Sequence, residues 1–212
     1  MKNNILLGDS LLLMKNLKDR SVDHVITDIP YDVVSRESNG IRKFDKDVAD
    51  VLEFDLDLFV KQITRIANDK ILIFCASEQV STLIKSLNKE GFPADLAIWK
   101  KTNPSPVNGQ YIWLSGVECC VVASRNELSE DLKNVIWETS GGRSKNHPTE
   151  KPLKLLNLII KNHTKKSDLI LDPCAGSGST LESALLNNRF FIGIEKHKEY
   201  YDFIIKRINN CG

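Results

Sequence analysis

The sequence lacks any long apolar run. No stretch of its 212 residues approaches the ~20 consecutive apolar positions of a membrane-spanning helix. Met1-Lys2-Asn3-Asn4 leads directly into a short strand-like run, without the apolar region of a signal peptide. We therefore expect a soluble cytoplasmic protein that is not secreted.

Cysteine and histidine spacings typical of metal sites are also absent. The chain has five cysteines and four histidines, but no CxxC pair and no histidine at ligand spacing from a cysteine. Structural zinc sites need such spacings, and disulfide frameworks belong to short secreted chains. We expect reduced thiols and no metal ion.

The chain has no excess of charge of either sign. Lys and Arg number 29 against 28 Asp and Glu, a net charge of +1. A nucleic-acid surface must therefore come from local clusters of cations. The length suits one well-buried α/β domain, and we expect a single domain over residues 1–212.

The most informative stretch covers residues 169–180, LILDPCAGSGST. Its apolar start predicts a buried strand that ends at Asp172, followed by a glycine turn and a helix. Gly176 and Gly178 would let the backbone approach a ligand closely, and the carboxylate suits an ammonium better than a phosphate. A bare Gly-Ser-Gly is more often only a turn, so the flanking strands carry this interpretation.

A second apolar strand, residues 190–195, ends in Glu195 about 20 residues after the glycine turn. Nucleoside-binding folds place an acceptor for the ribose hydroxyls at this position. No lysine occupies a Walker-type position, which argues against a phosphate cradle. Together these features favour an adenosine-bearing cofactor with an ammonium at its other end, as in S-adenosylmethionine.

Asp28-Ile29-Pro30-Tyr31, at the end of a strand expected over residues 23–28, is the second chemical centre. Asp28 can accept a hydrogen bond from an amine, the carbonyl beside Pro30 can accept another, and Tyr31 can stack on a planar ring. The alternative is a simple strand-ending turn.

Strand-like and helix-like patterns alternate along the rest of the chain. The expected strands cover residues 5–7, 70–76, 95–99 and 117–123, and the expected helices residues 11–17, 51–66, 80–89, 153–160 and 196–209. Loop insertions are expected around residues 32–50 and 101–116, with a short segment at 124–146. This order predicts a Rossmann-like α/β fold with a mixed, mostly parallel sheet flanked by helices.

The combined motifs resemble the beta-class DNA amino-methyltransferases. The matching segments are Asp28-Ile29-Pro30-Tyr31, His147-Pro148-Thr149-Glu150-Lys151-Pro152, residues 172–180 and Gly193-Ile194-Glu195; Glu118 also matches a family position. The catalytic element precedes the cofactor turn, as in the circularly permuted methyltransferase fold. Ile29 and Cys174 depart from the usual proline and phenylalanine, and residues 124–146 are too few for a large target-recognition region.

The resemblance implies methyl transfer from S-adenosylmethionine to the exocyclic amine of a flipped base in DNA. Adenine N6 is favoured because Asp heads the tetrapeptide. Alternatives are cytosine N4, a catalytically silent nucleic-acid-binding subunit, or an RNA or glutamine substrate. The resemblance also implies a bacterial, phage or mobile-element origin, and it is compatible with a homodimer or a partner subunit.

Site residues follow from the same resemblance. The catalytic set is Asp28, Pro30 and Tyr31. The cofactor-binding set is Asp9, Ser10, Thr149, Lys151, Asp172, Pro173, Cys174, Gly176, Ser177, Gly178 and Glu195. Asp9 or Ser10 could instead cap a helix. The cations Arg36, Arg42, Lys100 and Lys101 are candidate DNA contacts, although Lys100 and Lys101 also fit an ordinary surface loop.

Overall fold

The computed structural model describes residues 2–31, 55–104, 116–128, 134–141 and 150–211. Its strands are β1 (Asn4–Leu7), β2 (Val22–Asp28), β3 (Ala67–Cys75), β4 (Ala94–Lys101), β5 (Val117–Ser124), β6 (Ile136–Thr139), β7 (Leu169–Asp172) and β8 (Phe190–Glu195). Its helices are α1 (Ser10–Met14), α2 (Leu56–Ile66), α3 (Val80–Lys89), α4 (Leu153–His163), α5 (Ser179–Leu186) and α6 (Lys198–Asn209).

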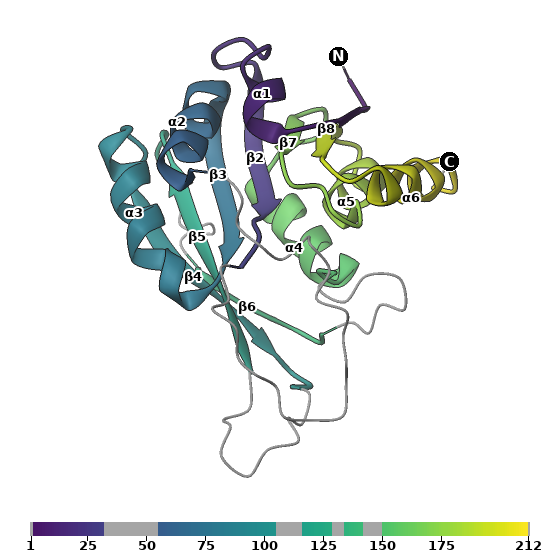
Figure 1. Ribbon diagram of the computed structural model, residues 1–212. Helices are drawn as coiled ribbons and strands as arrows, with labels where there is room; N and C mark the ends of the chain where they lie inside the picture. Colours follow the sequence, from purple (N-terminus) through teal and green to yellow (C-terminus); the bar gives the residue numbers. More distant parts are fainter. Residues whose placement is uncertain (1, 32–54, 105–115, 129–133, 142–149, 212) are drawn as a thin grey trace, which may run out of the picture.

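These strands form one mixed sheet in the order β1-β8-β7-β2-β3-β5-β4-β6 (Figure 1). Within it, β5 runs antiparallel to both of its neighbours, β3 and β4. The other pairings are parallel. The order confirms the predicted α/β fold with a mixed, mostly parallel sheet.

Helices cover both faces of the sheet (Figure 1). One face carries α1, α2 and α3, whose buried residues include Phe59, Ile63 and Leu83. The other face carries α4, α5 and α6, which bury residues such as Leu156 and Leu181. Because both faces are covered, the central strands are nearly continuous apolar runs.

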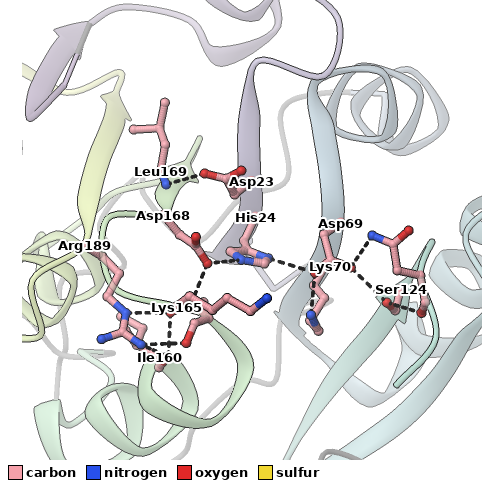
Figure 2. A network of polar contacts seen from close by, with 12 residues as sticks. Asp23, His24, Asp69, Lys70, Ser124, Ile160, Lys165, Asp168, Leu169 and Arg189 are labelled. Carbon is pink, nitrogen blue, oxygen red and sulfur yellow. Dashed lines mark hydrogen bonds and ion pairs between the residues drawn. The ribbon is translucent and has the colours of Figure 1, made fainter. Parts of the chain in front are cut away.

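A polar network ties the amino-terminal ends of the central strands together (Figure 2). His24 Nε2 on β2 lies 2.8 Å from Asp168 Oδ2, and Asp23 accepts a hydrogen bond from Leu169 N at 2.7 Å. Burial lowers the pKa of His24, so the imidazole stays neutral at physiological pH. His24 precedes Asp28 by four residues on β2, so the network lies on the order of 13 Å from that strand's carboxyl end.

Most expected elements occur, with shifted boundaries. The helix 80–89 and the strand 190–195 agree with the structure, and β3 begins three residues before the predicted strand 70–76. Asp55 caps α2 by accepting hydrogen bonds from Asp57 N and Leu58 N, so this helix begins at Leu56. Residues 51–54 lie outside the described part.

The strand β6 was not expected within residues 124–146. Its four residues are too few for a clear alternating pattern, and parallel pairing with β4 creates the strand. No helix in the described ranges is long and apolar enough to cross a membrane. Among the same residues, no group of three or more His, Cys, Asp or Glu could hold a metal ion.

Candidate functional site

A pocket lies where the carboxyl ends of β1, β8, β7 and β2 meet. From β7 the chain returns through α5 to β8 on one side, whereas β2 continues to β3 on the other. Such a reversal opens a crevice at the strand ends of an α/β sheet. Twelve of the candidate residues line it: Asp9, Ser10, Asp28, Pro30, Tyr31, Lys151, Asp172, Pro173, Cys174, Gly176, Ser177 and Glu195. The candidate Gly178 is not among the lining residues.

The glycine turn has a backbone that other residues would strain. Gly176 and Gly178 have φ values of +50° and +77°. A Cβ added at Gly178 would lie 2.9 Å from the Ile204 side chain of α6. Gly176 N donates to Glu195 Oε2 at 2.8 Å, which ties the turn to the end of β8. Both glycines thus meet a conformational need, and Gly178 also leaves room for the Ile204 side chain.

Asp172 is a buried carboxylate at the end of β7, with 2% of its surface exposed. Its Oδ1 accepts hydrogen bonds from Thr27 Oγ1 at 2.8 Å and Cys174 N at 3.1 Å. Burial outweighs these bonds and raises the pKa of Asp172 to about 7. Such an acid is poised to become fully ionised when a cation enters the pocket.

Glu195 faces the same pocket from β8. In addition to the bond from Gly176, its Oε1 accepts a hydrogen bond from His197 N at 2.8 Å. A carboxylate offers about four lone-pair sites, so two bonds leave capacity for ligand hydroxyls.

Asp9 caps α1, because its Oδ1 accepts a hydrogen bond from Leu12 N at 3.0 Å. Ser10 is the first residue of that helix. The capping alternative therefore describes Asp9, while both side chains also line the pocket. Their contact with a ligand remains a prediction.

The second chemical centre lies at the end of β2, where Lys151 joins the tetrapeptide. The Lys151 ammonium lies 2.5 Å from Asp28 Oδ2 and 3.0 Å from the Tyr31 hydroxyl. Asp28 Oδ1 is buried and has no hydrogen-bond partner among the described residues. Burial holds the pKa of Asp28 above its usual range, and the Lys151 ammonium opposes that rise.

Glu118 on β5 belongs to this centre, although the sequence assigned it no role. Its Oε2 lies 3.2 Å from the Lys151 ammonium and its Oε1 lies 2.6 Å from the Lys101 ammonium. Burial opposes ionisation, but these two lysines keep the pKa of Glu118 below its usual range. The available signals were one carboxylate within a mostly apolar strand and the match of Glu118 to a family position.

Gln79 is another residue that the sequence did not reveal. Its Nε2 donates to the Pro30 carbonyl at 3.1 Å, and its Oε1 accepts from Ala76 N at 2.9 Å. The buried amide therefore fixes the backbone of the tetrapeptide against the end of β3.

The candidate DNA contacts are placed unequally. Lys100 is 57% exposed and pairs with Glu138 at 3.1 Å. Lys101 is 19% exposed, and its charge is compensated by Glu118. Arg36, Arg42 and the candidate cofactor residue Thr149 lie outside the described residues.

Comparisons with known proteins agree with this site. A DNA methylase family model matches residues 122–207. The methylase YubD of Escherichia coli (strain K12) is 30% identical over 200 residues, covering 92% of this chain and 85% of its own. The type II methyltransferase M2.MboI of Moraxella bovis is 26% identical over 239 residues, covering 96% and 86%.

Solved structures give the same assignment. The M1.HpyAVI–SAM complex aligns with a TM-score of 0.75 and 30% identity, over 96% of this chain and 98% of that one. The cytosine-N4-specific PvuII DNA methyltransferase has a TM-score of 0.75 at 18% identity, over 100% and 91%, which shows a shared fold. The chain therefore belongs to the beta class of DNA amino-methyltransferases, the N6/N4 DNA methylases, whose cofactor is S-adenosylmethionine.

Proposed function

We propose that this methylase modifies the N6 amine of a flipped adenine in DNA, and that Asp28 receives that amine. The observation that carries the proposal is Asp28 Oδ1, a buried acceptor at the pocket that lacks a donor among the described residues. A buried acceptor without a donor costs free energy, and an amine N–H would supply that donor. Adenine is favoured over cytosine because Asp heads the tetrapeptide.

The pocket residues fit S-adenosylmethionine. The Asp172 carboxylate suits an ammonium, the turn at Gly176 and Gly178 allows close backbone approach, and Glu195 retains acceptor capacity for ribose hydroxyls. Asp9 would lie beside the adenine ring of the cofactor. Bound there, the cofactor supplies an electrophilic methyl carbon on a sulfonium sulfur.

The tetrapeptide would prepare a poor nucleophile. An exocyclic amine delocalises its lone pair into the ring, so acceptors for both of its N–H bonds favour a pyramidal nitrogen. Asp28 Oδ1 is one acceptor. The Ile29 carbonyl, which precedes Pro30, would be the second, since the Pro30 carbonyl already accepts one hydrogen bond from Gln79 and has less acceptor capacity left.

Tyr31 would stack on the base once it has left the duplex. The nitrogen lone pair would then form the new N–C bond with the methyl group that S-adenosylmethionine would supply, and the electron pair of the broken C–S bond would stay on sulfur. The nitrogen finally releases one proton to solvent. No covalent bond between enzyme and base is required.

The domain organisation is also a proposal. We place residues 1–212 in one methyltransferase domain, with base recognition in short loops or on a partner subunit or second copy. In support, the described part of residues 124–146 contributes only the last residue of β5 and the short strand β6.

The test is single-turnover methyl transfer by Asp28→Ala, with Asp95→Ala as the exposed-acid control. Loss of an interaction that strengthens in the transition state should slow transfer on the order of 100-fold or more. S-adenosylmethionine affinity should change little, whereas the melting temperature should fall because the buried Lys151 ammonium loses its nearest carboxylate; Asp95→Ala should match the wild type in all three measurements.

Mass spectrometry of the product nucleosides tests the base. N6-methyladenine supports the proposal, and N4-methylcytosine would replace the assigned target. A near-wild-type rate for Asp28→Ala would remove the proposed mechanism. Cofactor binding by the wild type without transfer to any DNA would favour a silent subunit.

A further inference from the structure

Lys151 is a buried ammonium in contact with three groups of the catalytic centre. It is 5% exposed and lies 2.5 Å from Asp28 Oδ2, 3.0 Å from the Tyr31 hydroxyl and 3.2 Å from Glu118 Oε2. Its ammonium also lies 5.2 Å from the centre of the Tyr31 ring. These contacts hold the Lys151 ammonium beside the Asp28 carboxylate and Tyr31.

Charge is balanced within this cluster. Asp28 and Glu118 supply two carboxylates, and Lys151 and Lys101 supply two ammonium groups. Burial alone would lower the pKa of Lys151, but Asp28 and the other acidic neighbours keep it well above its usual range. Lys151 therefore stays charged within the cluster. The ammonium groups and the carboxylates depend on one another, because a single unpaired charge at this depth would be strongly unfavourable.

We propose that Lys151 is a positioning residue for methyl transfer, which engages Asp28 Oδ2 and the Tyr31 hydroxyl and so presents Asp28 Oδ1 and the Tyr31 ring to the base. The proposal rests on the proposed function. Glu118 is the anchor of this arrangement, since its Oε2 holds the ammonium from β5 while its Oε1 is held by Lys101. The ammonium leaves one carboxylate oxygen of Asp28 for the amine.

A second consequence concerns the ionisation of Asp28. Burial favours its protonated form, and a protonated carboxyl is a weaker acceptor for an amine N–H. Lys151 provides the positive charge that opposes protonation, whereas Glu118 acts in the opposite direction. Removal of Lys151 should therefore raise the pH at which Asp28 becomes an effective acceptor.

Other titratable groups face Asp28 from the neighbouring elements. They are Tyr31 after β2, Cys75 on β3, Glu118 and Cys120 on β5, and Asp172 and Cys174 at the end of β7. Burial raises the pKa of all three thiols, which therefore stay neutral below pH 9. Asp172, with a pKa near 7, titrates in the relevant range. Saturating S-adenosylmethionine keeps the contribution of Asp172 to the pH profile the same in all variants.

The experiment measures the rate of single-turnover methyl transfer as a function of pH, from pH 6 to about 9.5, and compares the midpoints of the resulting profiles. The ordinary pKa values of ionisable side chains set this range. The variants are Lys151→Met, Lys151→Arg and, as an exposed-lysine control on α3, Lys85→Met. Lys151→Met should transfer on the order of 100-fold more slowly at pH 7, with its midpoint about one to three units higher. Lys151→Arg should restore the wild-type midpoint and part of the rate, and Lys85→Met should match the wild type.

Glu118→Gln provides an independent test of the proposal. Removal of this anchor of the Lys151 ammonium should slow transfer. Glu118 itself raises the pKa of Asp28 while it holds Lys151, which lowers it, so the transfer rate is the readout for this variant. Glu118→Gln keeps the proposal testable if Lys151→Met does not fold, and a wild-type transfer rate in Glu118→Gln would contradict the proposal.

The outcomes separate this inference from the proposed function. An unshifted midpoint in folded Lys151→Met, with Asp28→Ala inactive, would overturn the inference alone. A more than tenfold loss of S-adenosylmethionine affinity at an unshifted midpoint would assign Lys151 to the cofactor instead. Near-wild-type transfer by Asp28→Ala would remove the proposed function itself.

Discussion

At the scale of single residues, Ile29 shows how the chain accommodates a departure from the usual tetrapeptide. Its side chain is buried in the core on the α1–α3 face, and its amide donates to the Phe74 carbonyl at 3.1 Å. A proline here could not make that bond, because it has no N–H. The bond extends the contact between β2 and β3 and holds the tetrapeptide without the first proline.

Ile29→Pro should therefore destabilise this protein, even though it restores the usual family residue. The lost hydrogen bond and buried methyl groups should lower the free energy of unfolding by about 2–3 kcal/mol. Ile29→Val, which keeps the N–H, should cost only about 1 kcal/mol. Urea unfolding of both variants measures the difference, and equal stabilities would show that the Ile29 amide contributes nothing.

Asp172 gives a second prediction at this scale, because its pKa is about 7 in the folded protein and 3.8 is its reference value. Between these values the folded state binds the proton more tightly than the unfolded chain, so stability falls as pH rises through this window. Asp172→Asn removes the penalty. Its stability advantage over the wild type should grow by about 2–3 kcal/mol from pH 5 to pH 8, or roughly 4–12 °C in melting temperature.

The same substitution should weaken cofactor binding. An ammonium loses a charged acceptor, which is worth about 1.5–3 kcal/mol and therefore at least a tenfold change in affinity. Calorimetry with S-adenosylmethionine and melting curves at both pH values test the two effects. A pH-independent stability difference would show that Asp172 does not carry the raised pKa.

At the scale of elements, Arg207 on α6 connects the parts that surround the glycine turn. Its guanidinium donates to the Ser177 carbonyl at 3.0 Å and lies 2.7 Å from Glu150 Oε1. It also forms a short ion pair with Glu182 on α5. One side chain thus joins α5, α6, the turn and the residue before Lys151.

Arg207→Met should loosen this junction. It leaves two largely buried carboxylates without their cation, so the free energy of unfolding should fall by about 2 kcal/mol or more. S-adenosylmethionine affinity should fall by on the order of tenfold, because the turn loses its anchor. Lys198→Met breaks the exposed Lys198–Asp202 pair on the same helix and should change neither quantity measurably. Unchanged affinity in Arg207→Met would show that the turn holds its shape without α6.

At the scale of the whole molecule, near-neutral charge limits how DNA can be bound. With a net charge of +1, any phosphate contact must come from local cations. DNA affinity should fall with salt even so, and Lys100→Met should reduce the slope of log affinity against log salt by about one. Lys101→Met should change the slope less, because Glu118 already compensates that charge. Anisotropy titrations with duplex DNA measure the slopes, and a flat wild-type slope would argue against phosphate contacts.

Local patterns in the sequence were sufficient for the alternation of strands and helices, the glycine turn and the placing of Asp28-Ile29-Pro30-Tyr31 at the end of a strand. The apolar strands ending in Asp28, Asp172 and Glu195 predicted which side chains meet at one edge of the sheet. This worked because the carboxyl ends of parallel strands share an edge, so no long-range contact had to be known. The short strand β6 lacked such a pattern.

Only the tertiary structure decided what those side chains contact. The Lys151 ammonium contacts Asp28, which lies 123 positions earlier in the sequence, and Glu118 on β5. Arg207 contacts Ser177 in the glycine turn, 30 positions before it. Such pairs depend on strand order, and on burial that makes an unpaired charge costly, neither of which is encoded in a local pattern. The sequence determined which chemical groups the site contains, and the fold determined that a buried lysine holds the Asp28 carboxylate, because only the assembled sheet brings β2, β5 and the start of α4 together.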